Sequence, residues 1–387
     1  MRGSWRTGRI MGIDITVDVS WFLIAFLLIY TLGFLQFPRE LHPRVFAPRA
    51  DVTSVGLGIA ACLLIFASVL AHELSHSWMA IQRGIPVTRI TLFIFGGVAQ
   101  IANEPDRPIT EFLIAIMGPL MSLTLAALFG AVWIWTQIID STRLFGSLLA
   151  PIIILSSLLA QINAQLALFN LAPGFPLDGG RVLRAILWGI THNIRRATWW
   201  AARAGQLIAL LLIGVGAWLF FAQFNGGGIW FALIGFFLWN AAGEGYRQML
   251  LTETLRNVTI RQLMTHEVET VPPDATIAEF VDQHLMPKRD QTFAVSLGSA
   301  FQGIISLDQV KPIARADWNI RRVRDAMIPR ATLAALSPDQ PAAAAMAQLS
   351  SSDALELPVL EADQVVGFIG RAELSRFLQL KSQMESR

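Results

Sequence analysis

The stretch "VTSVGLGIAACLLIFASVLAHELSHSW" (residues 52–78) begins as an uncharged apolar run and ends with three ionisable side chains, His72, Glu73 and His76. About 20 apolar helical residues are enough to cross a bilayer, and the run before His72 has that length. Ionisable groups at membrane depth are costly unless they have partners. The stretch therefore predicts a membrane-spanning helix that carries a polar site near one end.

Four further long runs of the chain lack charged residues. The composition is 54% hydrophobic and only 15% charged, whereas about a quarter of the residues are charged in an ordinary soluble protein. The last run is broken by "FNGGG" (residues 224–228), so it predicts two helices joined by a tight turn. The runs together predict an α-helical membrane protein with about six transmembrane helices, from residues 19–37, 52–71, 112–139, 144–177 and 204–243.

Arginine residues are distributed unevenly between the apolar runs. They are frequent before the first run, after the second and after the fourth, and they are sparse in the other loops. The positive-inside rule places the arginine-rich side in the cytoplasm, and six spans would return the C-terminal tail to that side. The excess of arginine over lysine suggests a GC-rich bacterial genome, so the expected location is a bacterial inner membrane. The formal net charge of +2 gives no indication of a nucleic-acid partner.

The tail has the composition of a soluble domain and repeats itself. "PDAT" (residues 273–276) returns as "PDQP" (residues 338–341), and "GIIS" (residues 303–306) returns at a similar spacing as "GFIG". Each unit reads as a turn, a helix, two short strands and another helix. We therefore expect a membrane domain in residues 1–250 and a soluble α/β domain in residues 257–387, with repeats at about 257–318 and 319–381.

His72-Glu73-Leu74-Ser75-His76 is an HExxH sequence. On a helix, positions i and i+4 share one face, so both imidazoles can reach one metal ion, and Glu73 can act as a general base. A catalytic zinc ion also needs a third protein ligand and an open position. Asp178, in "FNLAPGFPLDGGR" (residues 169–181), is the strongest candidate. The alternatives are a proton relay at the histidines and a helix-capping role for Asp178.

Two of these segments resemble the paired signatures of the site-2 protease family, which are intramembrane zinc metalloproteases: "AHELSHSW" (residues 71–78) and "NLAPGFPLDGGR" (residues 170–181). The resemblance covers about residues 8–250 and extends to "GRIMGIDITVDVSWFLI", "LFIFGGVAQI" and "IMGPLMSL". It implies one Zn²⁺ per chain, bound by His72, His76 and Asp178, with Glu73 as the base and Asn170 near the catalytic centre. From the residues alone, Asn170 would instead form a hydrogen bond between helices.

The segment "RITLFIFGGVAQI" (residues 89–101) is apolar and β-prone but too short to span a membrane. It predicts a membrane-associated β-hairpin after the second helix, whose edge could pair with an extended substrate. Gly96 and Gly97 would permit a close approach of the two backbones. The alternative is a hairpin that packs only against its own helices.

The tail resembles a CBS-domain pair, and some site-2 proteases carry such a pair at the C-terminus. The resemblance implies an adenine-nucleotide site, but its residues fit poorly. Ser306 matches the expected hydroxyl residue, whereas Asp308 falls one place early and Gln309 occupies the aspartate position. The second repeat has Gly370 and Glu373 at these positions. A dimerisation or regulatory packing module therefore stands beside ligand sensing, and a homodimer through the pair is one expectation.

The function predicted from these features is that of a zinc endopeptidase. It would hydrolyse a peptide bond within or near the transmembrane helix of a single-span, membrane-bound regulator, in contact with membrane lipid. A CBS-regulated transporter is one alternative, but the intramembrane charges concentrate on two motifs instead of spreading over several helices. A catalytically silent metal-binding scaffold is another, and it would have no need of Glu73.

Overall fold

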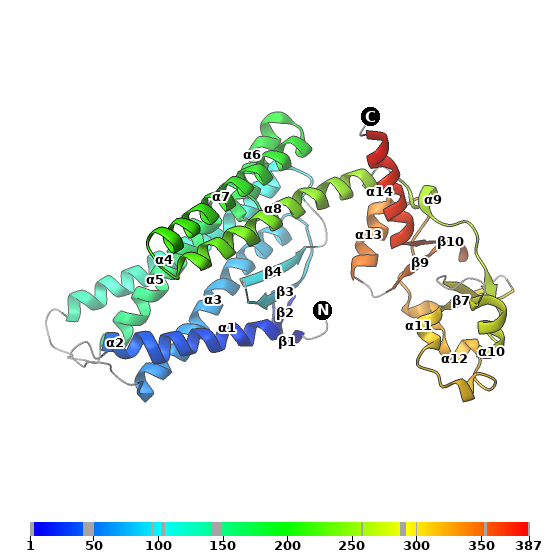
Figure 1. Ribbon diagram of the computed structural model, residues 1–387, viewed down its shortest axis with the longest axis horizontal. Helices are drawn as coiled ribbons and strands as arrows, with labels where there is room; N and C mark the ends of the chain where they lie inside the picture. The colour runs from blue at the N-terminus through cyan, green and yellow to red at the C-terminus, as the bar shows by residue number, and fades with distance from the viewer. Residues whose placement is uncertain are drawn as a thin grey trace. The chain divides into compact units, whose positions relative to one another are not determined.

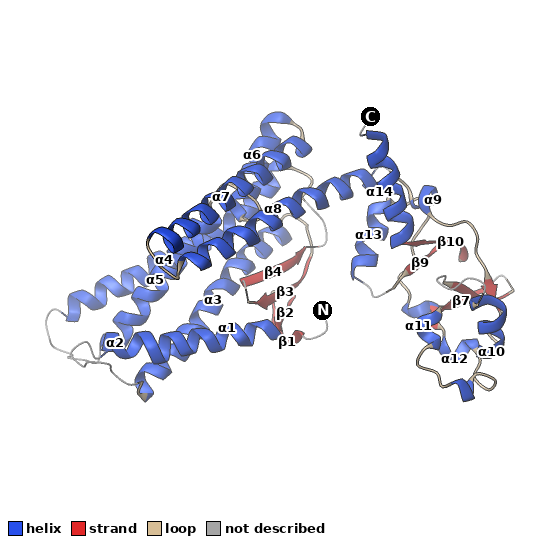
Figure 2. Cartoon of the chain, in the orientation of Figure 1, coloured by secondary structure: helices blue, strands red, loops and turns tan. Residues whose placement is uncertain are grey.

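The structure is a computed structural model that describes residues 4–41, 50–94, 96–101, 105–140, 149–256, 258–286, 292–298, 300–351 and 354–385. The chain divides into two compact units, Met1–Tyr246 and Arg247–Arg387 (Figure 1). The first unit is mainly helical, and the second combines short helices with two small sheets (Figure 2).

The helices of the first unit follow the apolar runs of the sequence. Within the described residues, five helical segments are long and apolar enough to cross a membrane: Val19–Leu41, Val52–Gln82, Pro108–Asp140, Ala150–Asn170 and Ile194–Ala222. The first segment consists of α1 (Val19–Ile29), a π-helical stretch η1 (Tyr30–Gln36) and α2 (Phe37–Leu41), and the other four are α3, α4, α5 and α7. Between the last two lies the shorter helix α6 (Asp178–Thr191).

The break at "FNGGG" separates α7 from α8 (Gly228–Arg256). α8 contains the end of the last apolar run but is not among the five segments. Side chains within α8, among them Gln248, lie outside the described set.

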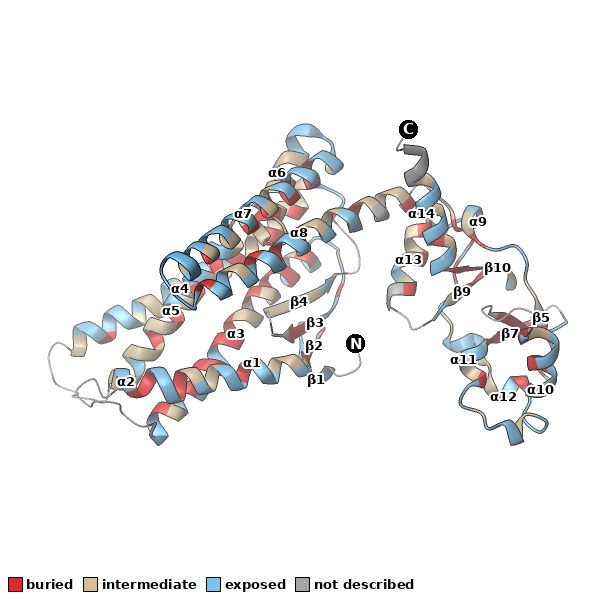
Figure 3. Ribbon diagram, in the orientation of Figure 1, coloured by how far each residue is buried: buried red, intermediate tan, exposed pale blue. Residues whose placement is uncertain are grey.

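Small residues bring the helices of this unit close together. A Cβ atom on Gly58 of α3 would lie 2.8 Å from the Cα atom of Gly33, and one on Gly216 of α7 would lie 2.6 Å from Ala232 N of α8. Large apolar side chains such as Phe26, Leu168 and Phe221 are exposed. Exposed and buried positions alternate along the helices (Figure 3). Small residues at contacts and apolar side chains outside are the pattern expected when lipid is the solvent.

A four-stranded sheet lies beside α3 in the first unit (Figure 1). Its order is β1 (Ser4–Ile10), β2 (Ile13–Asp18), β3 (Val87–Phe93) and β4 (Gly96–Ile101), and only the β2–β3 pair is parallel. The sheet packs through Ile13, Ile15 and Ile90 against Ala80 of α3 and Ile114 of α4. β4 therefore forms one edge of the sheet next to the helix that carries the HExxH sequence.

The pairing of residues 4–18 as β1 and β2 lies outside what the sequence analysis predicts. β1 is exposed over almost its whole length. An exposed strand needs no alternation of apolar and polar residues, and without that alternation its sequence does not identify it as a strand. It is held by the turn at Met11 and Gly12, both with positive φ, and by the register with β2.

The second unit contains two strand hairpins, each followed by a helix. Its four-stranded sheet has the order β5-β6-β7-β8, and β9 and β10 form a separate pair. Its elements are α9 (Ile260–Leu263), β5 (Thr270–Val271), α10 (Ile277–Phe280), η3 (Val281–Leu285), β6 (Phe293–Leu297), β7 (Ala300–Ile305), α11 (Leu307–Val310), η4 (Arg315–Asp317), α12 (Val323–Ala326), β8 (Ile328–Pro329), η5 (Arg330–Thr332), α13 (Ala342–Ser351), β9 (Glu356–Glu361), β10 (Gln364–Gly370) and α14 (Arg371–Glu385).

The two halves of this unit are interlocked. Ile260 and Met264, which precede the first hairpin, are buried in the same core as Leu336 and Val359 of the second half. Thr265 forms an isolated bridge with Phe368 of β10. In turn, β8 pairs with β7 of the first hairpin. Each half therefore completes its core with residues from the other half.

Candidate metal centre

His72 and His76 lie one turn apart near the C-terminal end of α3, and both are at least 95% buried. Their Nε2 atoms are 3.2 Å apart. The helix begins at a capping box in which Asp51 and Ser54 bind each other's backbone N–H groups, and it continues for 31 residues. A long, well-capped helix fixes the two imidazoles on one face.

Asp178 reaches the same point from α6. Its Oδ2 atom lies 3.1 Å from the Nε2 atoms of both His72 and His76. The chain turns sharply just before it, and the two residues that follow it approach this turn closely. A Cβ atom on Gly179 would lie 2.3 Å from Leu171 O, and one on Gly180 would lie 2.3 Å from Gly174 C. Only glycine permits this approach, so the "DGG" sequence sets the position of the carboxylate.

α4 (Pro108–Asp140) orients both imidazoles from the other side. His76 Nδ1 donates a hydrogen bond of 2.6 Å to Ile114 O, because a carbonyl can only accept. When neutral, the ring therefore carries its lone pair on Nε2, toward Asp178. His72 Nδ1 lies 2.9 Å from Ser122 Oγ. Hydrogen bonds to the second ring nitrogen are typical of metal-ligating histidines.

The three donor atoms fit a tetrahedral zinc ion. They are 3.1–3.2 Å apart, and zinc–ligand bonds of about 2.0–2.1 Å would separate them by roughly 3.3 Å. The backbone leaves room for an ion, because a Cβ atom on Gly118 of α4 would lie 2.1 Å from His76 Nε2 and 2.6 Å from His72 Nε2. The donor set of two imidazoles and one carboxylate is also one that zinc prefers.

Glu73 lies next to the edge strand β4. A Cβ atom on Gly97 would be 2.5 Å from Glu73 Cγ and 3.4 Å from its Oε1, so the strand passes this close only because residue 97 is glycine. Gly96 adopts a φ of +127°, which side chains rarely permit. The structure thus brings Glu73, Gly97 and the three donor groups into one region.

The remaining predicted residues lie elsewhere. Asn170 is the half-buried last residue of α5. Ser306 is the N-cap of α11, where its Oγ lies 2.7 Å from Gln309 Oε1. Asp308 is exposed and forms an ion pair of 2.7 Å with Lys311. Ser306 and Asp308 are therefore engaged in local contacts of the second unit.

Several contacts of the centre escape prediction from the sequence. Gly118 and Ser122 lie within "IMGPLMSL", and their spacing of four residues puts both on the same face of α4. That spacing of small residues is the signal that could have singled them out. Asn163 of α5 is a further polar residue that the sequence analysis did not single out, and its Nδ2 donates to Ser68 Oγ of α3 at 3.2 Å.

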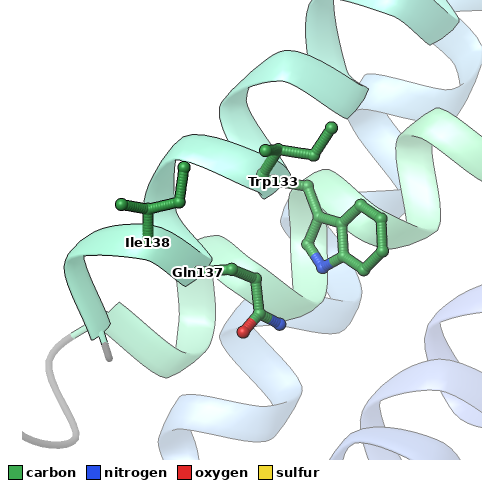
Figure 4. A pocket seen from close by; sticks show the side chains of 4 residues that line it. Trp133, Gln137 and Ile138 are labelled. Atoms are coloured by element: carbon green, nitrogen blue, oxygen red, sulfur yellow. The ribbon is translucent and has the colours of Figure 1, made fainter.

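A groove of about 360 Å³ lies on α4 among Trp133, Ile134, Gln137 and Ile138 (Figure 4). All four residues belong to a single helix, and the groove begins 15 residues after Gly118 in the chain, roughly 22 Å along the helix axis. It is an open feature of the outer surface and does not contribute to the centre.

Comparison with known proteins places these features in a family. Residues 60–213 match the model of peptidase family M50. The zinc metalloprotease Rip3 of Mycobacterium tuberculosis is 31% identical over 98% of this chain and 94% of its own length. The zinc metalloprotease sll0528 of Synechocystis sp. is 33% identical over 98% of this chain and 96% of its own. A solved site-2 protease from Methanocaldococcus jannaschii aligns with a TM-score of 0.41 at 26% identity, over 63% of this chain and 95% of that one.

Two relatives above 30% identity thus match the chain over nearly its whole length and theirs. The matched region of the family model includes the HExxH sequence and most of its helix, α4 and the loop that leads to Asp178. The chain therefore belongs to peptidase family M50, the site-2 proteases, and is a zinc metalloprotease that acts within the membrane.

Proposed function

We propose that His72, His76 and Asp178 bind the zinc ion and that Glu73 is the general base in this intramembrane proteolysis. The observation that carries the proposal is the convergence of three donor atoms, which lie 3.1–3.2 Å from one another. The space beside them is open only because residue 118 has no Cβ atom. The substrate would be a single-span, membrane-bound regulator, cut within or near its transmembrane helix.

His72, His76 and Asp178 would hold a zinc ion there, and the ion would supply Lewis-acid chemistry toward a peptide carbonyl and lower the pKa of water to about 7. The Glu73 carboxylate takes the proton of the attacking water and delivers it to the leaving amide nitrogen. His76 remains oriented by its bond to Ile114 O, and His72 by its bond to Ser122. These bonds hold both rings in place, with both Nε2 atoms facing Asp178 Oδ2.

A transmembrane substrate must be unwound before its peptide bonds can be reached, because its helix hides them in internal hydrogen bonds. The β3–β4 hairpin is proposed to dip into the membrane and to pair with the unwound segment through the free edge of β4. Gly97 supports this, since its lack of a side chain lets β4 lie against Glu73. Asn170, at the start of the loop to Asp178, would supply hydrogen bonds to the same segment.

The proposed topology has six spans, with α8 as the sixth, and places the N-terminus and the tail in the cytoplasm of a bacterial cell. The arginine-rich loops support this orientation. Residues 1–250 would form the membrane protease domain, and residues 257–387 a CBS-type pair that regulates or dimerises it. Homodimerisation is measurable as the mass of the full chain in detergent by light scattering.

The experiment that tests the proposed centre is Glu73→Gln. The variant should retain one zinc ion per chain and lose cleavage of a co-expressed single-span substrate, since an amide cannot accept the proton of water. His72→Ala and Asp178→Ala should lose both zinc and cleavage. Glu40→Gln, at an exposed position of α2, is the matched control and should resemble the wild type. Unchanged cleavage in Glu73→Gln would remove this residue from the mechanism.

A further inference from the structure

A buried ion pair joins α4 to α6 inside the membrane unit. Glu111 is 1% exposed and Arg184 is 8% exposed. Arg184 Nε donates to Glu111 Oε1 at 2.6 Å, and Arg184 Nη2 contacts the same oxygen. Burying two charges requires accurate geometry to offset the loss of hydration, so such a pair adds little stability over apolar packing. Its position relative to the metal centre is more informative.

The guanidinium of Arg184 also contacts the loop that precedes Asp178. Its Cζ atom lies 5.2 Å from the centre of the Phe175 ring, within the range of a cation–π interaction. The loop backbone is also held by α7, because Phe175 N donates to Ala201 O at 3.1 Å. A Cβ atom on Gly205 of α7 would lie 2.0 Å from Phe175 O, so this contact is close.

Glu111 belongs to the part of α4 that orients the histidines. It lies three residues before Ile114, whose carbonyl accepts the His76 hydrogen bond, and that is roughly 4.5 Å along the helix. Gly118 and Ser122 follow on the same helix. Arg184 therefore connects the element that orients the imidazoles with the loop that presents the Asp178 carboxylate.

We propose that Glu111 and Arg184 are positioning residues that hold Asp178 at the correct distance from His72 and His76. The inference rests on the proposed function, in which Asp178 is a zinc ligand. Neither residue touches the donor atoms, so the pair acts through the Phe175 loop and the first turn of α6. Without it, the carboxylate samples positions that bind the ion less well.

The test measures metal binding in the full chain in detergent or nanodiscs. Glu111→Leu/Arg184→Met replaces the ion pair by apolar side chains, a kind of exchange that preserves folding in other proteins. We expect its zinc affinity, measured by competition with a chelator, to fall about 10–100-fold. The visible absorption spectrum of the cobalt-substituted variant should also change, because that spectrum reports coordination geometry. The thermal unfolding of the metal-free form should stay close to that of the wild type.

Thr136→Val is the matched control. Thr136 is buried on α4 far from Glu111, and its hydroxyl bonds only carbonyls of its own helix. This variant should keep the wild-type affinity and cobalt spectrum. Phe175→Leu removes the ring contact and retains the ion pair, and it should weaken binding to a smaller extent. If the double variant does not fold, Phe175→Leu alone tests whether the contact with Arg184 positions Asp178.

The outcomes separate the inference from the proposed function. The positioning role is overturned if the double variant has the zinc affinity and the cobalt spectrum of the wild type, provided that Asp178→Asn loses zinc. If the double variant does not fold, the same result in Phe175→Leu overturns it. If Asp178→Asn itself retains zinc, the proposed ligand set fails instead. A lower unfolding temperature with unchanged metal binding would show that the pair only stabilises the fold, which also overturns the inference.

Discussion

At the scale of single residues, Gly118 illustrates how a missing side chain can define a site. Leaving the donor atoms accessible to an ion requires that no Cβ lies among them, and α4 passes so close that any other residue would place one there. The HExxH spacing could be read from the sequence because it is local. The role of Gly118 could not, because it depends on the separation of two helices.

Gly118→Ala should abolish zinc binding, because its Cβ atom would lie 2.1 Å from His76 Nε2 and the helix backbone cannot move away easily. Metal analysis of the purified chain checks this. Gly130→Ala, on the same helix, is the control: its Cβ atom would meet nothing closer than 4.0 Å. That variant should bind zinc normally and be as stable as the wild type or slightly more so, by up to about 1 kcal/mol. Normal zinc binding in Gly118→Ala would contradict the proposed centre.

Glu356, at the start of β9, predicts a pH dependence of the second unit. Burial raises its pKa, two hydrogen bonds with Thr292 lower it in part, and the nearby Glu373 carboxylate raises it further. The folded state therefore binds a proton more readily than the unfolded state, so this group costs stability as the pH rises through its folded pKa. Glu356→Gln should stabilise the unit at pH 7, and the gain should disappear below the ordinary glutamate pKa.

Hydrogen exchange of the β9 and β10 amides measures the change in stability that Glu356→Gln should cause. Glu279 serves as the opposite case, because hydrogen bonds with Thr276 lower its pKa in a capping box. Its contribution to stability is present above the ordinary glutamate pKa and is lost as the pH falls through the folded pKa. Glu279→Gln should therefore destabilise the unit at neutral pH, and a loss of stability in both variants at pH 7 would argue against this interpretation of Glu356.

At the scale of elements, β4 is the strand on which substrate selection is proposed to depend. In the described residues it pairs only with β3, so its other edge has free backbone groups. Successive residues of a strand direct their N–H groups to opposite edges. Proline at position 98 or 99 therefore removes a donor from the free edge in one case and from the β3 pairing in the other.

One of these two proline substitutions removes an N–H group from the free edge of β4. We expect that variant to bind zinc normally and to lose most cleavage of a single-span substrate. The other variant should also weaken the hairpin, which limited proteolysis detects. Zinc content and cleavage in membranes are the measurements. Full cleavage by both Val98→Pro and Ala99→Pro would favour the alternative in which the hairpin packs only against its own helices.

The whole molecule combines a membrane protease with a second unit whose cleft is acidic. A cavity of about 480 Å³ in that unit is lined by three carboxylates and one imidazole among neutral side chains: Glu267, Glu356, Glu373, His266, Thr265, Thr292, Phe368 and Ala372. Three carboxylates would repel the phosphates of a nucleotide. Ser306 and Asp308 are engaged in local contacts of α11.

Titration of the full chain with AMP, ADP and ATP in a calorimeter should therefore give no heat of binding at micromolar nucleotide. The triple variant Glu267→Gln/Glu356→Gln/Glu373→Gln is the comparison, because it removes the negative charge without changing the shape of the cleft. Micromolar binding by the wild-type chain would overturn the electrostatic argument.

The amino-acid sequence by itself predicted the long apolar helices, the polar site at the end of the second one and Asp178 as a candidate partner for the two histidines. Each of these follows from local properties: apolar length, the helical period and the helix-breaking residues around "APGFPLDGG". They predict much of the protease unit, because a membrane restricts the chain to few structures.

Only the tertiary structure decided the four-stranded sheet, the space at Gly118, the Glu111–Arg184 pair and the interlocked halves of the second unit. All four depend on residues that are far apart in the chain and approach within a few ångströms. No local pattern encodes such distances, because they result from how every helix and strand packs at once. The proposed zinc site depends on both, since its candidate ligands can be read from the sequence but their geometry depends on α4.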